Sequence, residues 1–553
     1  MGPMDSSAHK YIPALIATAL LVNLSGLFVP LMDPDAGVYA SISKNMVLNG
    51  DPVNLIFQDT DWLDKPHFPF WVTAIFFRIF GFHDWAYKLP AILFIFIAAR
   101  YTWLLARKYY DATTAGWSVV LLLSSLHIII SNSDVRAEPY LTGLIIASVY
   151  HFSNVIDRKW AGHLVVASLF AACAVMTKGL FTLLPIGGAV AGQLLLKKEW
   201  KQVFHFKWLI ALALIAVFTL PEIWCLWKQF DQHPEKRVLG ETGVSGIRFF
   251  LWDSQFGRFF NTGPIKGKGD KLFFLHTLLW AFLPWALLMY AALFRQVRDW
   301  LGKKKAAVQE WFTLSGSLLT LLLFSFSGFQ LPHYTNIIFP FLSILTANQI
   351  GRVAASGKRI WPRIQYAVGA LVLIFSTFLL LLFQPVITPV FIVGMAATLL
   401  FVVEILRKPE RDHWTSFRFS ALTLVAVGLF LNLCFYPSLL RYQSGNQAAA
   451  YLNRQDPGAA LGRIGIYFPS GEFYLKAHTY RTDIDSVSYG SFDHARYLFV
   501  TESEKKQLEE RNVSLEVIKR FESFHVTMLN LRFVSHHTRH KELKYDYLIR
   551  LQP

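Results

Sequence analysis

Leu371-Val-Leu-Ile-Phe-Ser-Thr-Phe-Leu-Leu-Leu-Leu-Phe383 is an uninterrupted run of uncharged residues, and Leu164–Met176 is a second run of the same kind. Clusters of charged residues bound both runs. Over its 553 residues the chain is 54% apolar and only 16% charged, whereas soluble domains carry about 25% charged residues. One soluble core stops growing near about 250–300 residues. The sequence therefore predicts an integral membrane protein.

The formal net charge of +16 does not indicate a nucleic-acid-binding protein. The basic residues form short clusters between apolar segments and do not follow one face of a helix. The three cysteines, Cys173, Cys225 and Cys434, each lie within an apolar run, so no disulfide framework is predicted. We expect membrane lipids as partners, no nucleic acid, and a monomer.

The apolar pattern predicts thirteen membrane-spanning helices, several of them shorter than the roughly 20 residues of a perpendicular span. Their approximate ranges are 11–30, 88–106, 113–131, 139–156, 161–177, 180–196, 208–227, 273–294, 311–329, 334–350, 364–383, 387–406 and 418–437. The first segment lacks a small-x-small cleavage site, so we expect a retained span and not a removed signal peptide.

The distribution of Lys and Arg predicts the orientation of these spans. If the N-terminus is cytoplasmic, the basic clusters lie in the inner loops, as the positive-inside rule requires. These clusters are Arg107/Lys108, Arg158/Lys159, Lys197/Lys198/Lys201, Arg295/Arg298/Lys303/Lys304/Lys305, Lys358/Arg359/Arg363 and Arg407/Lys408/Arg411. Loops 31–87 and 228–272 and the C-terminal tail then lie outside, and Phe68–Phe82 is predicted to form amphipathic helices in the membrane interface.

The tail loses the apolar character of the rest of the chain. Ile464–Phe468, Tyr497–Val500 and Tyr547–Leu551 are typical of strands, and Ser503–Arg511 of a helix. We therefore predict a transmembrane domain over residues 1–437, with outer loops 31–87 and 228–272, and a small α/β domain over residues 438–553.

Ionisable residues recur at the predicted outer ends of the spans. Asp35 follows the first span, although a carboxylate there can simply end the span. Asp134, Arg136 and Glu138 share one short turn, where charge at membrane depth must pair or serve a site. An Asp134–Arg136 structural pair is the alternative.

Basic residues accompany these acids on the same predicted face. Lys65 could bind lipid headgroups, and Lys178 could extend to the headgroup level. Arg258 lies in the basic, glycine-containing loop 228–272, which resembles a lid over an anionic ligand. Tyr334 lies in the segment Gln330-Leu-Pro-His-Tyr334 at another outer helix start, where a plain turn is the alternative.

The sequence contains no GxGxxG or P-loop, and no HExxH, CxxC or nucleophile elbow. Nucleotide-activated sugars are absent from the non-cytoplasmic side of the membrane, so a sugar donor used there must be linked to a lipid.

A series of short motifs resembles the bacterial polyprenyl-phosphate-sugar transferases, which include the lipid A 4-amino-4-deoxy-L-arabinose transferases and are related to the protein O-mannosyltransferases. The resemblance covers about residues 10–350, and it depends on the order and spacing of the motifs. The motifs are Asp35-Ala-Gly-Val-Tyr39-Ala-Ser-Ile-Ser43, Gly50-Asp51, Asp64-Lys65-Pro66, Phe80-Gly81-Phe82, Lys88-Leu-Pro90, Thr177-Lys178-Gly179, Gln255-Phe-Gly-Arg258-Phe259, Phe282-Leu-Pro284-Trp285 and Leu331-Pro332-His333-Tyr334.

The resemblance implies an all-α polytopic membrane protein with the class C glycosyltransferase fold. By the same resemblance Asp35 matches the catalytic aspartate, and Lys65 and Arg258 match the residues that hold the carrier phosphate. Lys178 and Tyr334 match neighbours of that pocket. Glu138 matches the second acidic position, and Asp134 is an open alternative for it.

Two departures from the family pattern affect what we predict. Related sequences often have Asp-Glu-x-x-Tyr where this chain has Asp35-Ala36. Where some members place a metal between an acidic residue and a histidine, this chain has Asp64 and Asp253. We therefore predict no particular metal or other cofactor, and a divalent metal near Asp64 and Asp253 is left as an open alternative.

The resemblance implies an inverting transfer of a monosaccharide from polyprenyl (undecaprenyl) phosphate to lipid A or a similar envelope glycolipid. The reaction is expected at the periplasmic face of a bacterial inner membrane, with the N-terminus cytoplasmic and the C-terminal domain periplasmic. A protein acceptor is the first alternative. A lipid flippase or transporter is an alternative of a different class. Inverted repeats would support that alternative, but none is seen in the sequence.

Overall fold

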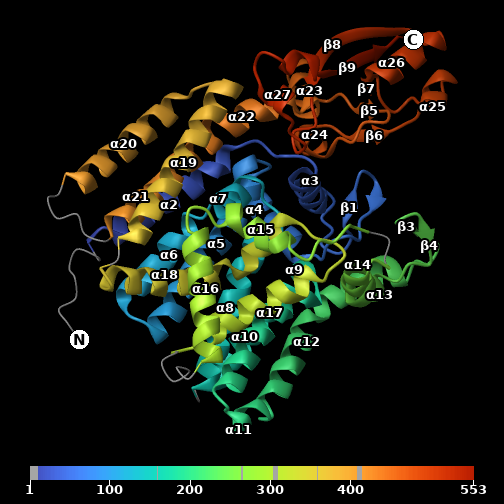
Figure 1. Ribbon diagram of the computed structural model, residues 1–553. Helices are drawn as coiled ribbons and strands as arrows, with labels where there is room; N and C mark the ends of the chain where they lie inside the picture. The colour runs from blue at the N-terminus through green and yellow to red at the C-terminus, as the bar shows by residue number, and fades with distance from the viewer. Residues whose placement is uncertain are drawn as a thin grey trace.

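The computed structural model describes residues 10–157, 160–262, 266–302, 309–357, 359–407 and 414–552. A helical part makes up most of the chain, and a smaller part with a β-sheet lies at one end of it (Figure 1). Outside the described residues lie several of the basic residues used to assign the inner loops: Arg158, Lys159, Lys303, Lys304, Lys305, Lys358, Lys408 and Arg411.

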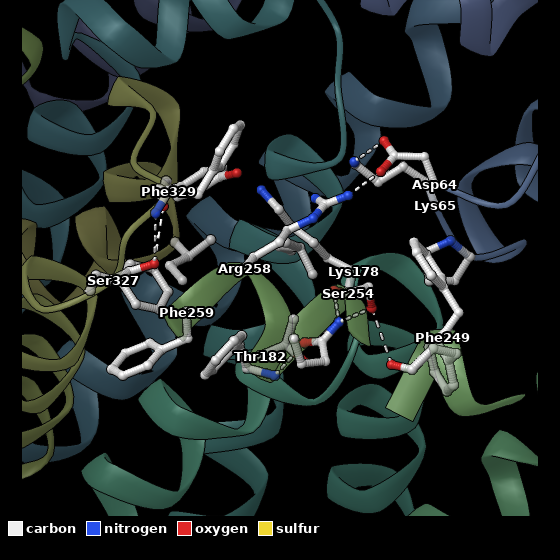
Figure 2. A pocket seen from close by; sticks show the side chains of 18 of the residues that line it. Asp64, Lys65, Lys178, Thr182, Phe249, Ser254, Arg258, Phe259, Ser327 and Phe329 are labelled. Atoms are coloured by element: carbon white, nitrogen blue, oxygen red, sulfur yellow. Dashed lines mark hydrogen bonds and ion pairs between the residues drawn. The ribbon is translucent and has the colours of Figure 1, made fainter. Parts of the chain in front are cut away.

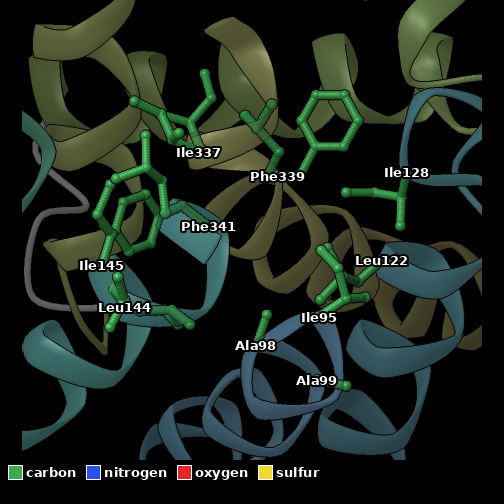
Figure 3. Packing of buried hydrophobic residues seen from close by; sticks show 14 of the residues in the cluster. Ile95, Ala98, Ala99, Leu122, Ile128, Leu144, Ile145, Ile337, Phe339 and Phe341 are labelled. Atoms are coloured by element: carbon green, nitrogen blue, oxygen red, sulfur yellow. The ribbon is translucent and has the colours of Figure 1, made fainter. Parts of the chain in front are cut away.

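Five helices form the centre of the helical part: α5 (Asp84–Tyr109), α6 (Ala112–Leu123), α8 (Glu138–Ile156), α9 (Trp160–Lys178) and α18 (Phe339–Ala355). Helix α8 packs against both α5 and α9, and α18 packs against α6. Figure 3 shows Ile95 of α5, Leu144 of α8 and Phe341 of α18 among the side chains of one packed cluster. All three are essentially inaccessible to solvent, so these helices form one continuous apolar core.

The remaining helices of this part are arranged around that core. They are α2 (Ile12–Ser25), α3 (Asp35–Leu48), α4 (Phe68–Phe80), α7 (Leu126–Ser133), α10 (Leu183–Leu196), α11 (Trp200–Val203), α12 (Lys207–Leu226), α13 (Gly246–Arg248), α14 (Arg258–Phe260), α15 (Phe273–Ala281), α16 (Ala286–Leu301), α17 (Phe312–Ser325), α19 (Ile360–Phe383), α20 (Pro389–Leu406), α21 (Thr415–Phe430) and α22 (Tyr436–Leu439). Two antiparallel hairpins pair β1 (Ile56–Phe57) with β2 (Thr60–Asp61) and β3 (Arg237–Val238) with β4 (Glu241–Thr242).

Each of the thirteen predicted spans is helical over most of its length in the described residues. Within the described part of the chain, seven helices are long and apolar enough to cross a membrane, and an eighth crossing results if α6 and α7, which meet at 50°, are one bent span. Helices α2, α4, α10 and α17 are apolar but shorter. The membrane character of the chain is therefore supported, whereas the count of thirteen spans stays a prediction.

Helices α19 and α20 are the most exposed of the long apolar helices: only 11% of the apolar window of each is buried within the protein. Apolar side chains such as Leu371, Phe375 and Leu400 are 65–71% exposed. Both helices pack against α21, but most of their apolar surface is not covered by protein, which matches a lipid-facing span.

Helix α4 covers most of the segment predicted to form amphipathic helices. It buries Phe70 and Phe77 and leaves Ile75 and Ile79 more than half exposed. The helix is therefore apolar on its free face as well, which suits an interface with lipid; its interfacial location stays a prediction.

The C-terminal part contains a five-stranded mixed sheet in the order β6-β5-β7-β9-β8. Strand β5 is parallel to β6 and β7, and β9 is antiparallel to β7 and β8. The strands are β5 (Leu461–Arg463), β6 (Thr479–Arg481), β7 (Tyr497–Thr501), β8 (Leu515–Ser523) and β9 (Lys544–Leu551), with helices α23 (Ser444–Gln455), α24 (Pro469–Tyr474), α25 (Ile484–Ser488), α26 (Glu502–Glu510) and α27 (Leu531–Val534).

The predictions for this part are confirmed in three places and wrong in one. Strands β7 and β9 and helix α26 lie where the sequence predicts them. The predicted strand Ile464–Phe468 is wrong, because β5 ends at Arg463 and Gly465 takes a φ of +64°, outside the extended region.

The packing of α5 against α8 gives a testable prediction. A Cβ atom added at Gly143 would lie 2.4 Å from the backbone oxygen of Phe94, whereas one added at Gly187 meets nothing within 4 Å. We expect Gly143→Ala to force the two helices apart at a cost of about 1–3 kcal/mol, and Gly187→Ala to leave stability unchanged or slightly raised. The apparent Tm of both purified variants measures this, and equal Tm values would contradict the close helix contact.

Candidate active site

Asp35 is the first residue of α3, and it joins a cluster of charges from the turn before α8. Its carboxylate Oδ2 lies 2.7 Å from Nη1 of Arg136, and Nη2 of the same arginine lies 2.9 Å from Oδ2 of Asp134. The Asp134–Arg136 pair considered from the sequence is thus present, but the arginine also binds Asp35. Asp35 keeps 42% of its side chain exposed, so its carboxylate remains accessible to a reactant.

The surroundings of Asp35 strengthen it as a base. Partial burial raises the pKa of Asp35 above its usual value, and the Arg136 guanidinium opposes that rise. The charges of Lys65 and Glu138 also act on the Asp35 carboxylate. The acidic cluster therefore lies within electrostatic reach of the basic residues that the sequence analysis selected.

Lys65, Lys178, Arg258 and Tyr334 line one cavity, which we call the cationic pocket (Figure 2). The pocket encloses about 970 Å³ of empty space, including its opening to solvent. Apart from these residues the lining is mostly apolar, with Phe181, Phe249, Phe250, Phe259, Phe274 and Phe324. A cationic end on an apolar cavity fits an amphiphile with an anionic head group.

Asp64 organises the cations of this pocket. It pairs with Lys65 at 2.5 Å and with Nη2 of Arg258, and Figure 2 shows both cations directed toward its carboxylate. Burial raises the pKa of Asp64, but Lys65 and Arg258 outweigh that effect and hold the pKa at about 2. Asp64 is therefore ionised at neutral pH and orients both cations.

Lys178 and Glu138 form a second ion pair beside the pocket. Glu138 is 2% exposed, and Nε2 of His333 lies 3.8 Å from its Oε1. The Lys178 Nζ lies 3.8 Å from the centre of the Tyr334 ring, within the range of a cation–π contact. Glu138 is thus bound to Lys178 and Asp134 to Arg136, so the two candidates for the second acidic position differ in partner.

Irregular helical segments bring Lys178 and Arg258 together. Arg258 follows a π-helical segment, Phe249–Gly257, whose Gln255 donates to the carbonyl of Lys178 at 3.3 Å and accepts from the amide of Phe181 at 3.2 Å. Gly179, between those two residues, has a φ of +96°, and a Cβ there would lie 2.0 Å from the Gln255 amide. Only glycine fits this close approach.

A buried pair that the sequence analysis missed holds the segment after Lys65. Glu222 of α12 accepts from the backbone amide of His67 at 2.9 Å and lies 3.0 Å from its Nδ1. The other ring nitrogen, Nε2, is 2.8 Å from the carbonyl of Val53, and both side chains are fully buried. An isolated glutamate within the apolar run 208–227 was the signal in the sequence.

The two residues that match a metal position in some relatives are engaged elsewhere. Asp64 binds Lys65 and Arg258, and Asp253 lies 3.7 Å from Nε of Arg248. Within the described ranges no group of three or more His, Cys, Asp or Glu side chains is arranged to hold a metal ion.

Helix α3 is held by the C-terminal part. Lys44 is 7% exposed, and its Nζ donates to the carbonyls of Glu472, Phe473 and Leu475 at 3.1, 3.0 and 2.6 Å. Two residues before Asp35, Asp33 accepts from the amide and hydroxyl of Ser470 at 2.8 and 2.7 Å. The helix that begins with Asp35 is therefore bound to α24 at both ends.

The sequence is similar to one protein family and to several bacterial transferases. Residues 64–225 match the family described as dolichyl-phosphate-mannose-protein mannosyltransferase. The undecaprenyl phosphate-alpha-4-amino-4-deoxy-L-arabinose arabinosyl transferase of Enterobacter sp. (strain 638) is 26% identical over 358 residues, which is 64% of this chain and 61% of that protein. The transferase of the same name from Pseudomonas aeruginosa PAO1 is 28% identical over 330 residues, 57% of this chain and 56% of that protein.

These matches span about three fifths of the length of the curated relatives. The crystal structure of ArnT from Cupriavidus metallidurans bound to undecaprenyl phosphate superposes with a TM-score of 0.73 at 18% identity, over 98% of both chains. The chain shares the ArnT fold, and the family resemblance stated from the motifs is confirmed.

The binding of α3 to the C-terminal part predicts a stability effect. Lys44→Met keeps the length of the side chain but removes the donor to three carbonyls, so we expect a loss of about 1–3 kcal/mol for the polar groups left unsatisfied. Lys476→Met changes an exposed lysine of the same region and is the matched control. The apparent Tm of the purified variants measures the loss, and a Tm equal to that of the control would show that Lys44 does not stabilise this contact.

Proposed function

We propose that the protein is an inverting glycosyltransferase that moves a monosaccharide from undecaprenyl phosphate to lipid A or a similar envelope glycolipid. One observation carries the proposal: a largely apolar pocket lined by Lys65 and Arg258 lies within electrostatic reach of a partly exposed carboxylate, Asp35. The named relatives use an undecaprenyl-phosphate donor, which supports the same donor for this chain.

The carrier phosphate binds at Lys65, Arg258 and Lys178, and the isoprenoid tail lies along the phenylalanines of the cationic pocket. Arg258 can hold a phosphate through two parallel hydrogen bonds, whereas each lysine acts as a point charge. Because Asp64 and Glu138 already orient these cations, the site has little reorganisation to undergo when the anion arrives.

Transfer begins when an acceptor hydroxyl or phosphate oxygen attacks the anomeric carbon from the face opposite the carrier phosphate. Asp35 takes the acceptor proton, and its raised pKa favours that role. The bond between the anomeric carbon and the carrier oxygen breaks, and the electron pair leaves with undecaprenyl phosphate. Lys65 and Arg258 stabilise the charge that grows on that oxygen, which lowers the barrier more than it strengthens ground-state binding.

The proposed location is a bacterial inner membrane crossed thirteen times, with the N-terminus cytoplasmic. Residues 438–553 then form a periplasmic domain, above a transmembrane domain of residues 1–437. The seven long apolar helices and the asymmetry of Lys and Arg support this arrangement.

A protein hydroxyl is the second candidate acceptor. The match of residues 64–225 to a protein mannosyltransferase family favours it. Mass spectrometry of lipid A and of envelope glycoproteins, from cells with and without this protein, distinguishes the two acceptors.

Asp35→Asn tests the proposed base. We expect the variant to fold and to bind undecaprenyl phosphate normally, while the transfer rate falls by about 10²–10⁴-fold, which is typical for loss of a positioned base. The measurement is transfer of radiolabelled sugar from undecaprenyl phosphate to lipid A by purified protein. Asp59→Asn changes an exposed carboxylate of the same loop and serves as the control. Near-normal turnover by Asp35→Asn would remove Asp35 from the mechanism, and transport without consumption of donor would favour a flippase.

Arg258→Lys tests the phosphate contact. The change conserves charge but removes the planar donor pair, so we expect the affinity for undecaprenyl phosphate to fall about tenfold, the equivalent of one lost charge-assisted hydrogen bond. Arg248→Lys in the same loop, where the side chain is 75% exposed, provides the comparison. Unchanged affinity of Arg258→Lys for undecaprenyl phosphate would exclude Arg258 from phosphate binding.

A further inference from the structure

A second cavity lies between the C-terminal sheet and the loop that leads into α3. It encloses about 1400 Å³ of empty space, including its opening to solvent, and shares no lining residue with the cationic pocket. Asp33 and Pro34 form one wall, and the ends of β8 and β9, with the segments near them, form the other. The proposed mechanism uses none of these residues.

The cavity opens beside Asp35. Its wall residues Asp33 and Pro34 directly precede Asp35 in the chain. Tyr467 also lines the cavity, and the carboxylates of Asp33 and Asp35 both act on its phenol, which together with burial raises the pKa of Tyr467 to about 12. The Tyr467 ring is 58% exposed and lies edge-on to Phe57 at 6.2 Å between ring centres. The cavity therefore adjoins the segment that carries the proposed base.

The lining combines aromatic faces with neutral and acidic hydrogen-bonding groups. Its aromatic members are Tyr442, Tyr467, Phe468 and Phe524, and its polar members include Ser444, Ser523, Thr527, Asn530 and Asp546. Lys544 is the one lysine of the lining, which contains no arginine, against three carboxylates, Asp33, Glu542 and Asp546. Flat aromatic faces and carboxylates suit the hydroxyl groups of a sugar ring. Because carboxylates outnumber the lysine, any phosphate on the head group must lie outside this lining.

Exposed apolar side chains lie in the segment that lines part of the cavity and leads to the end of α19. Met528 lines the cavity and is 71% exposed, and nearby Leu531 is 78% exposed. This segment is fixed to the end of α19, because the amide of His536 donates to the carbonyl of Leu382 at 2.9 Å and Arg539 donates to that of Phe383 at 2.6 Å. Since α19 is an exposed apolar span, exposed apolar residues at its end lie at the bilayer surface.

We propose that this cavity binds the sugar head group of a membrane-anchored glycolipid acceptor, with Tyr467 as a ring platform for the head group and Met528 and Leu531 in contact with the acyl chains. The inference rests on the proposed function, in which Asp35 activates an acceptor, and it assigns to the C-terminal part the binding of that acceptor.

Binding of lipid A to the full-length protein in nanodiscs tests the inference, with undecaprenyl phosphate as a second probe. Tyr467→Ala removes the ring and Thr527→Trp narrows the cavity from an exposed position. Both are expected to weaken lipid A binding by about tenfold or more, a change of about 1.4 kcal/mol. Tyr489→Ala, at an 83% exposed tyrosine of the same sheet region outside the cavity, is expected to bind lipid A normally. All three variants are expected to retain the affinity for undecaprenyl phosphate.

A second measurement separates the head group from its anchor. Met528→Asp is expected to weaken the binding of lipid A but not that of its deacylated sugar head group. Lipid A binding that is absent in the unmodified protein, or equal in Tyr467→Ala and Tyr489→Ala, would overturn the inference, and so would displacement of lipid A by a serine-rich peptide acceptor.

The outcomes also separate this inference from the proposed function. If the unmodified protein transfers sugar from its donor and the cavity variants lose neither binding nor transfer, the acceptor site is wrong and the transferase stands. If lipid A binding depends on Tyr467 while no acceptor receives sugar, the cavity stands and the transferase function fails.

Discussion

A charge inside an apolar protein is stable only beside an opposite charge or a set of hydrogen-bonding groups, and opposite charges organise the whole candidate site. Asp64 neutralises Lys65 and Arg258, Glu138 neutralises Lys178, and Arg136 joins Asp35 to Asp134. Each cation is thereby oriented before any ligand arrives. An entering phosphate meets fixed donors in a site with little water, where electrostatic attraction is strongest.

The breaks in regular helix gather around the same site. The π-helical turns before Arg258, the left-handed Gly179 and the 3₁₀ segment Pro332–Ile338 all border the cationic pocket. Backbone groups freed by such breaks are tolerated at membrane depth only where they face protein partners or a polar cavity. The amide of Phe181 illustrates this, because it is satisfied by the Gln255 side chain. Irregular backbone and ionic side chains therefore need the same polar environment, and they occur together.

The C-terminal sheet has a structural connection to this site through α3. Lys44, Ser41 and Asp33 bind the backbone and side chain of Pro469–Leu475, and Gln443 bonds to the backbone of Leu31 and Asp33. A rigid-body movement of the sheet would move the first turn of α3, and Asp35 with it. Two of these residues, Asp33 and Gln443, also line the second cavity, so the position of the base and the shape of the proposed acceptor site are coupled.

The sequence by itself determined the helical membrane character of the chain, because apolar runs and charge clusters are local patterns. The thickness of the bilayer sets the length of each apolar run. The sequence also predicted strands β7 and β9 and selected Asp35, Lys65, Lys178, Arg258 and Tyr334 through motif order. It missed β8, whose sequence Leu515-Glu-Val-Ile-Lys-Arg-Phe-Glu-Ser523 has a mostly exposed, polar pattern at the sheet edge. It also placed a strand at Ile464–Phe468, directly after the end of β5, where Gly465 has a positive φ.

Only the tertiary structure decided which charge neutralises which. Asp64 lies 194 positions before its partner Arg258, and Glu222 lies 155 positions after His67. The tertiary structure also decided that the C-terminal tail folds against α3 and borders a cavity next to the segment that carries Asp35. Such pairings depend on distances between helices distant in the chain, and no local pattern encodes them, because each ionisable residue has several compatible partners until the fold brings one within reach.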